Sequence, residues 1–193
     1  MVIYNKISNR SNYGASRDTS VIRWIVMHYT ANDGDTAKAN ANYFANNVVK
    51  ASAHYFVDDN YIFQSVPDNY VAYSVGAKSA DKTKGGGRFF GRCTNKNSLN
   101  IELCDTNKNH VIYPTEATIQ KAIDLCLYLM NKYDIDSDHV IRHFDVTGKQ
   151  CPAYWIENGI WEAEFHSKIS IGSEISSLYN NVGNHHPPLP AML

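Results

Sequence analysis

The alternation of short apolar runs with longer segments of helical periodicity constrains the fold of this chain more than any other feature. The clearest helix signal covers residues 115–133, which begin with Thr-Glu and carry an apolar stripe at spacings of three and four. Short apolar and aromatic runs on both sides of it predict strands. The predicted strands are residues 22–27, 54–57, 61–66, 99–103 and 139–142, and the predicted helices are residues 35–47, 115–133 and 160–169. This order predicts an α/β fold with a mixed central β-sheet flanked by helices.

The size of the chain favours a single core. Its 193 residues are 44% hydrophobic, enough to bury one good core but hardly two. We therefore expect one folded domain over residues 1–170, followed over residues 171–193 by a linker or flexible tail rich in Ser, Asn, Gly and Pro. No stretch approaches the roughly 20 apolar residues that cross a bilayer, and the N-terminus lacks an apolar signal-peptide segment. The sequence thus predicts synthesis in the cytoplasm without a signal peptide, and no insertion into a membrane.

Four cysteines are too few and too scattered for the disulfide framework of a small secreted domain. Cys126 lies among leucines in the predicted helix, where a small buried apolar side chain is expected. We expect no disulfides, which leaves Cys151 available as a thiolate ligand.

A short segment brings an imidazole, an ammonium and a thiol together at His143, Lys149 and Cys151. The histidine and the cysteine are too far apart for one helical turn, so they can converge only if the chain between them folds back, which Gly148 favours. His28 ends an apolar strand and is a candidate third ligand. Two imidazoles and one thiolate suit zinc, and three protein ligands leave a fourth position for water. The alternatives are a hydrogen-bonded surface histidine and a structural thiol.

The predicted strand at residues 99–103 carries a carboxylate at Glu102. Period-two geometry sends Leu99, Ile101 and Leu103 to one face and Glu102 to the other. A carboxylate in the middle of a strand is costly unless a polar group meets it. Water activated by a metal would be such a partner, with Glu102 as general base and acid. The alternative is a glutamate paired with a nearby lysine or arginine.

Four motifs follow one another along the chain: Val26-Met27-His28-Tyr29-Thr30, Ser52-Ala53-His54-Tyr55-Phe56-Val57, Asn100-Ile101-Glu102-Leu103, and Arg142-His143 with Lys149-x-Cys151-Pro152. They resemble those of the zinc-dependent N-acetylmuramoyl-L-alanine amidases of type 2, a family related to peptidoglycan recognition proteins. The resemblance covers about residues 21–169 and is strongest to the catalytic domains of phage and prophage endolysins. It implies a peptidoglycan-recognition-like fold. It also implies cleavage of the amide bond between N-acetylmuramic acid and the L-alanine of the stem peptide, leading to lysis of a bacterial host.

The resemblance assigns a role to each candidate residue. It implies a Zn²⁺ ion held by His28, His143 and Cys151. Glu102 matches the catalytic glutamate of similar endolysins, and Lys149 matches a lysine that stabilises the oxyanion of the tetrahedral intermediate. A solvated loop lysine is the alternative for Lys149.

One position departs from the family pattern. In some relatives a catalytic tyrosine immediately precedes the histidine of the second strand, and here Ala53 stands in its place. The departure favours Glu102 as the base and leaves His54 as a candidate substrate contact. The alternative for His54 is a core histidine whose ring nitrogens are satisfied.

The expected partner is bacterial cell-wall peptidoglycan, with a pore-forming lysis protein needed for export because the wall lies outside the membrane. A non-catalytic peptidoglycan recognition module on the same fold is the main alternative. Recognition members that do not cleave typically lack the cysteine ligand, so Cys151 favours an enzyme. A zinc-stabilised nucleic-acid module is a weaker alternative, because the net charge is −1 and the ligand set is incomplete for structural zinc.

A Gly-rich segment at residues 78–96 holds six basic residues against the single acid Asp81. Such a local excess of positive charge can steer a protein towards an anionic cell wall. A solvated, mobile loop is the alternative.

Overall fold

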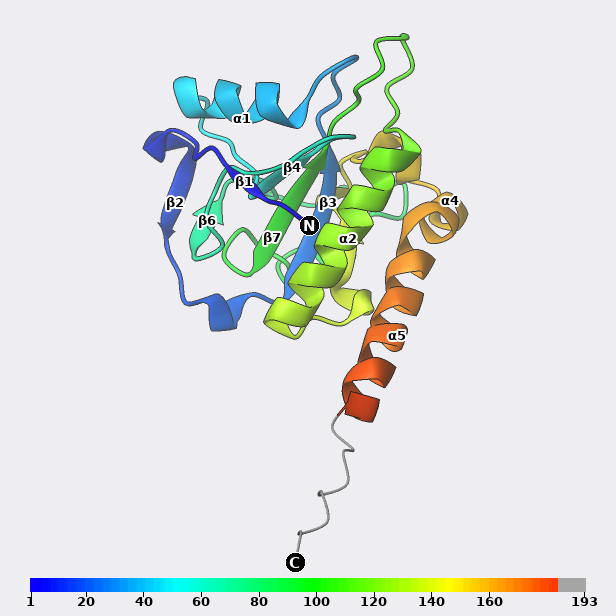
Figure 1. Ribbon diagram of the computed structural model, residues 1–193. Coiled ribbons are helices and arrows are strands. Elements are labelled where there is room, and N and C mark those ends of the chain that lie inside the picture. Colours follow the sequence, from blue (N-terminus) through cyan, green and yellow to red (C-terminus); the bar gives the residue numbers. More distant parts are fainter. Residues whose placement is uncertain (184–193) are drawn as a thin grey trace, which may run out of the picture.

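A six-stranded mixed sheet forms the centre of the molecule in the computed structural model, which describes residues 1–183 (Figure 1). Its strands in spatial order are β1 (Tyr4–Asn5), β5 (Ile62–Gln64), β4 (Tyr55–Val57), β7 (Ser98–Leu103), β3 (Trp24–Tyr29) and β8 (Val140–Arg142). All neighbouring pairs are parallel except β4 and β5. A second, two-stranded sheet pairs β2 (Tyr13–Ser16) with β6 (Tyr70–Ala72). The prediction of a mixed sheet flanked by helices is therefore confirmed.

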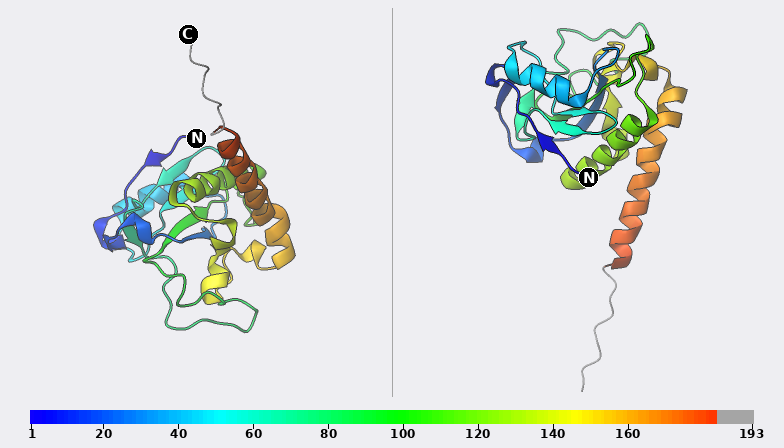
Figure 2. Two further views of the ribbon diagram at one scale, coloured as in Figure 1. Left: turned by 90° about the horizontal axis from the view of Figure 1, so that it is seen from below. Right: turned by 45° about the horizontal axis from the view of Figure 1, so that its top comes forward.

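Helices cover both faces of the large sheet (Figures 1 and 2). The α-helices are α1 (Ala37–Asn46), α2 (Glu116–Tyr133), α3 (His143–Thr147), α4 (Asn158–Trp161) and α5 (Ser167–Gly183). Short turns of other helix types are η1 (Arg10–Asn12), η2 (Thr19–Val21), η3 (Ser137–His139), η4 (Ala153–Trp155) and the π-helical η5 (Glu162–His166). The apolar stripe of α2 packs on one face, whereas the small residues of α1 pack on the other face against β4. No helix in the part of the chain described here is long and apolar enough to span a bilayer.

The strongest sequence signal produced the most regular helix. The Thr115 hydroxyl accepts a hydrogen bond from the Thr118 amide at 3.2 Å and caps the start of α2. Asp134 ends the helix in the left-handed conformation, where its amide bonds the Met130 carbonyl. The predicted hairpin is also present, because β4 and β5 are antiparallel and the Asp58 carboxylate accepts bonds from the amides of the turn.

Residues 160–169 are helical as predicted, although a π-turn, η5, divides them between α4 and α5. The expectation of a linker from residue 171 is wrong, because residues 171–183 are helical. The helix packs on α2 so closely that a Cβ added at Gly172 would lie 2.9 Å from Leu127 Cδ1, and Ile169 is fully buried. Packing thus outweighs the low helix propensity of Ser, Gly and Asn. The rest of the predicted tail, residues 184–193, lies outside the described residues.

Candidate functional site

Three buried side chains converge at the carboxyl ends of β3 and β8. His28 lies near the end of β3, His143 follows β8 directly, and Cys151 follows α3. Their ligand atoms all lie within 4.8 Å of one another, and His28 Nδ1 lies 3.8 Å from Cys151 Sγ. Two ligands that bind zinc at about 2.0 to 2.3 Å in a tetrahedral arrangement lie roughly 3.5 Å apart. The cluster therefore has the dimensions and the donor atoms of a zinc site.

The turn that returns Cys151 to His143 depends on Gly148. This glycine ends α3 with φ +81°, and a Cβ there would lie 1.7 Å from the Asp81 carbonyl oxygen. No other residue type fits that space. The Phe144 amide then bonds the Cys151 carbonyl at 2.9 Å, which ties the thiol-bearing residue to the first turn of α3. The fold-back that the glycine predicted is confirmed.

A buried ion pair fixes the start of α3. The Arg142 guanidinium donates to both Asp145 oxygens, at 2.9 Å and 2.8 Å, and the Arg142 amide donates to Asp145 Oδ2. Arg142 also donates to the Trp155 carbonyl, so the segment after Cys151 is fastened to the same residue. Both sides of the turn that carries His143 and Cys151 are held in place by this pairing.

The two imidazoles are in the state that a metal requires. Burial is the main cause that lowers the pKa of His28 to about 4 and that of His143 to about 2, with a smaller contribution from the Lys149 charge to both and from His28 to His143. Both rings are therefore neutral near pH 7. His143 Nδ1 is enclosed and has no hydrogen-bond partner. Buried polar atoms nearly always have a partner, so this nitrogen is available to a bound metal. Burial raises the pKa of the Cys151 thiol to about 12, and a bound cation would reverse that shift.

Glu102 stands beside His28 on the neighbouring strand, where the two residues are register partners. Leu99, Ile101 and Leu103 join the core under α2, so the predicted division of the strand into two faces is confirmed. Glu102 Oε2 is enclosed and has no hydrogen-bond partner. Burial raises the pKa of Glu102 to about 8, against the opposing effect of the Lys149 charge. The predicted alternative, an ion pair to lysine or arginine, is not found in the described part of the chain.

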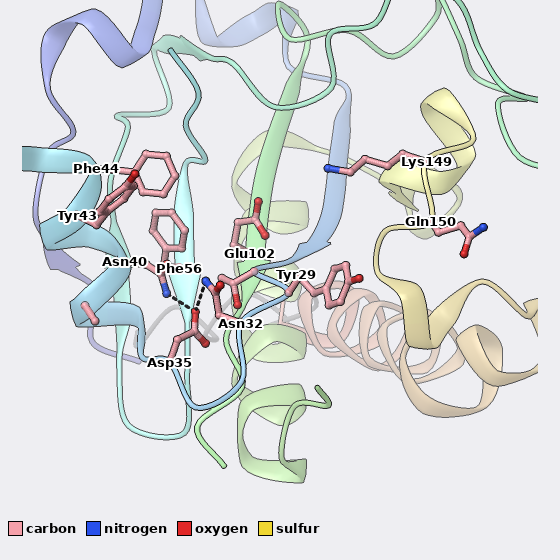
Figure 3. A pocket seen from close by; sticks show the side chains of 13 residues that line it. Tyr29, Asn32, Asp35, Asn40, Tyr43, Phe44, Phe56, Glu102, Lys149 and Gln150 are labelled. Carbon is pink, nitrogen blue, oxygen red and sulfur yellow. Dashed lines mark hydrogen bonds between the residues drawn. The ribbon is translucent and has the colours of Figure 1, made fainter. Parts of the chain in front are cut away.

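Lys149 and Glu102 both line one cavity of about 690 Å³, with Glu102 between Lys149 and the aromatic residues of α1 (Figure 3). Lys149 extends from the loop after α3, whereas Glu102 rises from β7. The remaining walls are formed by aromatic and amide side chains from the end of β3 and the segment after it, from α1 and from β4, among them Tyr29, Asn40, Tyr43, Phe44 and Phe56. A second cavity, of about 480 Å³, touches His143 and Lys149 from the side of residues 74–81. His143 thus lines the second cavity, whereas the first cavity is lined by Glu102 and by the chain neighbours of His28 and Cys151, Tyr29 and Gln150.

His54 differs from the other predicted site residues because it has no exposed surface. Its Nδ1 accepts a hydrogen bond from the Asn100 amide at 3.1 Å, and its Nε2 lies 3.1 Å from the Tyr70 carbonyl oxygen and 3.0 Å from Arg17 Nη2. Burial and the nearby Arg17 guanidinium lower the pKa of His54 to about 3. His54 is therefore a core histidine with satisfied nitrogens, and the interpretation as a substrate contact is not supported.

Sequence reasoning missed Asn100, whose Oδ1 lies 2.9 Å from His28 Nε2. Its side chain is fully buried on the face of β7 that also carries Glu102. The period-two relation between Asn100 and Glu102 was the available signal.

The basic segment at residues 78–96 lies over α3 and projects from the side of the sheet opposite α2 (Figure 2, left). Hydrogen bonds from the Asp81, Gly87 and Phe89 amides to α3 carbonyls attach it there. All six of its lysines and arginines are exposed. Steering towards an anionic wall stays a prediction.

Comparisons with known proteins agree with this geometry. A family model described as N-acetylmuramoyl-L-alanine amidase matches residues 18–154. The N-acetylmuramoyl-L-alanine amidase CwlL of Bacillus licheniformis is 33% identical over 153 residues, which are 77% of this chain and 41% of CwlL. The chain spans about two fifths of the length of the first curated relatives it matches.

Solved structures are similar over most of the chain. The structure of PlyL matches with a TM-score of 0.68 and 28% identity, covering 88% of this chain and 97% of that one. The catalytic domain of XlyA matches with a TM-score of 0.69 and 25% identity, covering 88% and 99%. Taken with the family match, these similarities show that the chain belongs to the N-acetylmuramoyl-L-alanine amidase family, whose members are generally zinc-dependent.

Proposed function

We propose that this chain hydrolyses the amide bond between N-acetylmuramic acid and the L-alanine of the peptidoglycan stem peptide. The observation that carries the proposal is a buried cluster of two imidazoles and a thiol next to an unpaired carboxylate, at the wall of a cavity. Residues 1–170 would form the catalytic domain. His28, His143 and Cys151 would hold Zn²⁺, which when bound supplies a Lewis acid that acidifies water and polarises the scissile carbonyl.

Glu102 is the general base and acid of the proposed reaction. Its carboxylate takes a proton from the attacking water as the new C–O bond forms at the lactyl carbonyl carbon. It then gives that proton to the alanine nitrogen as the C–N bond breaks. The products are a free lactyl carboxylate on the sugar and a stem peptide with a new amino terminus. An orphaned Oε2 suits this role, because it has no competing hydrogen bond to break first.

Lys149 provides positive charge for the transition state. As water adds to the carbonyl, negative charge develops on the carbonyl oxygen, and an ammonium held at the edge of a cavity stabilises it. Lys149 lines both cavities next to the cluster, which is where a substrate that extends to both sides would place its scissile bond.

The expected substrate extends in two directions from the scissile bond, a glycan on one side and a peptide on the other. The two cavities next to the cluster offer room for both. Action on the cell wall of a bacterial host, with a pore-forming lysis partner for export, is part of the proposal. Co-expression with and without such a pore-forming protein tests that part, because lysis should require both.

Peptidoglycan digestion tests the reaction directly. Purified cell walls are incubated with the chain, with and without a chelator, and new L-alanine amino termini and new reducing sugars are measured. New amino termini that depend on the metal are the expected result. Reducing sugars would instead indicate a glycosidase, and binding without cleavage would indicate a recognition module.

A further inference from the structure

The hydrogen bond between Asn100 and His28 connects the candidate metal site to the interior of the sheet. Asn100 Oδ1 lies 2.9 Å from His28 Nε2, and both side chains are buried. An amide oxygen can only accept, so the hydrogen of this bond belongs to Nε2 of the imidazole. The lone pair of the neutral ring is then on Nδ1, the atom that lies 3.8 Å from Cys151 Sγ.

The orientation of the Asn100 amide is itself fixed by the chain below it. Its Nδ2 donates to Ser98 Oγ at 3.2 Å, and Ser98 Oγ donates its own hydrogen to the Thr94 carbonyl at 2.8 Å. Since the serine hydrogen is used, its oxygen is left to accept from the amide. Turning the amide over would oppose oxygen to oxygen at Ser98 unless the serine gave up Thr94. The sequence of bonds from Thr94 to His28 therefore has one favoured direction.

His54 holds the backbone of the same residue. The Asn100 amide donates to His54 Nδ1 at 3.1 Å, and the His54 amide donates to the Asn100 carbonyl at 3.0 Å. His54 Nε2 lies 3.1 Å from the Tyr70 carbonyl oxygen. Asn100 is thus hydrogen-bonded at its backbone amide, its backbone carbonyl and its side chain, and these bonds fix the position of Oδ1.

We propose that Asn100 is a positioning residue that fixes the ring orientation and the tautomer of His28, so that Nδ1 faces the metal. The inference rests on the proposed zinc amidase function and deepens it, because it names what keeps one ligand ready. His54 hydrogen-bonds to Asn100 and not to His28, so its effect on the metal site is indirect and runs through Asn100. Mutation of a residue that hydrogen-bonds a metal-binding histidine generally weakens metal affinity about 10- to 100-fold, and we expect an effect of this size at Asn100.

Zinc affinity of the full chain, measured by competition with a chromogenic chelator, is the first test. Asn100→Leu removes the acceptor at similar volume and should weaken zinc binding about 10- to 100-fold. Asn100→Asp keeps an acceptor for the imidazole hydrogen and should stay within a few-fold of wild type (about 3-fold). The matched control is Asn12→Leu, because Asn12 is an equally buried asparagine that bonds only backbone groups around the end of α1. Asn12→Leu should lower stability and leave zinc affinity unchanged.

Histidine tautomers provide a readout that a merely structural role would not move. In chelator-treated protein labelled with ¹⁵N-histidine, wild type and Asn100→Asp should show His28 protonated at Nε2, and Asn100→Leu should show a mixture. If Asn100→Leu binds zinc as wild type does, or keeps a single Nε2–H tautomer, the inference is overturned. Wild type that binds no zinc or releases no L-alanine termini would overturn the proposed function instead, so the two failures are distinguishable.

Discussion

Asp68 and Glu102 are two carboxylates with enclosed oxygens that differ in their hydrogen bonds and in the direction of their pKa shifts. Asp68, near the C-terminal end of α2, accepts hydrogen bonds from Tyr55, Gln64, Lys132 and Tyr133 at 2.5 to 3.0 Å. Burial by itself raises the pKa of Asp68, but these donors and the Lys132 charge outweigh it and leave the pKa lowered. Glu102 has an enclosed oxygen without any donor, and its pKa is raised to about 8.

The difference distinguishes a carboxylate that stabilises the fold from one that is available for proton transfer. A carboxylate whose lone pairs are all used stabilises the fold and is not free to exchange protons. A carboxylate left unsatisfied at a cavity wall costs stability, and such a cost is typical of functional sites. Glu102 Oε2 and His143 Nδ1 share this unsatisfied character. Asp68 has satisfied partners and lies away from both cavities that meet Lys149.

Exchanging the Glu102 carboxylate for an amide should have the largest effect. Glu102→Gln removes the proton acceptor at constant shape, so turnover of peptidoglycan should fall by about 10²- to 10⁴-fold. Zinc content should be retained, because no metal ligand is lost. The assay is release of L-alanine amino termini, with metal content measured on the same sample. Full activity in this variant would remove Glu102 from the role of base.

Loss of the sulfur ligand should have the next largest effect. Cys151→Ser replaces a soft thiolate by a hydroxyl, which is a poorer zinc ligand, so affinity should fall roughly 100-fold or more, beyond the effect of losing an outer partner. Equilibrium dialysis against zinc buffers measures the change. Cys126→Ser is the control for loss of a buried thiol, since Cys126 lies in the core under α2. Equal zinc affinity in both variants would argue against Cys151 as a ligand.

Disturbing the satisfied carboxylate should change stability and little else. Asp68→Asn keeps the shape but loses the charge opposite Lys132 and mismatches a donor, which should cost about 1 to 3 kcal/mol of unfolding free energy. The rate of cleavage per folded molecule should stay close to that of wild type. Urea denaturation and the L-alanine assay together check both statements. A large fall in the cleavage rate of folded Asp68→Asn would break the division between the two carboxylates.

Much of this architecture could be predicted because its signals are local. The stripe of α2 and the alternation around Glu102 are short-range patterns, and the structure has both. Gly148 predicted the turn that brings Cys151 back to His143, because a glycine is also a local signal. These features depend on backbone conformation and on side-chain period, which a few consecutive residues determine.

What could not be predicted depends on partners far apart in the chain. His28 and Asn100 are 72 residues apart, and the bond between them follows only once β3 and β7 are neighbours. Residues 171–183 carry weak helix formers, and their helix follows from close approach to Leu127. His54 could be placed in a strand, but its two ring partners come from other segments. Tertiary context decided each of these cases.

The smallest expected effect is a difference in pH dependence between the two carboxylates. The folded pKa of Asp68 is lowered, so its contribution to stability is present above its unfolded pKa of about 3.9 and is lost as pH falls further. The folded pKa of Glu102 is raised to about 8 from an unfolded value of about 4.3, so folding loses free energy as pH rises between these values. In chelator-treated protein, the stability of Glu102→Gln relative to wild type should therefore rise with pH between about 5 and 8, by at most about 1.4 kcal/mol per pH unit. Urea denaturation at a series of pH values measures the gain, and Asp68→Asn should show no such slope relative to wild type in that range. If the stabilities of wild type and Glu102→Gln change with pH in parallel, the pKa of Glu102 is not raised in the folded protein. Glu102 and Asp68 would then differ in their hydrogen bonds alone.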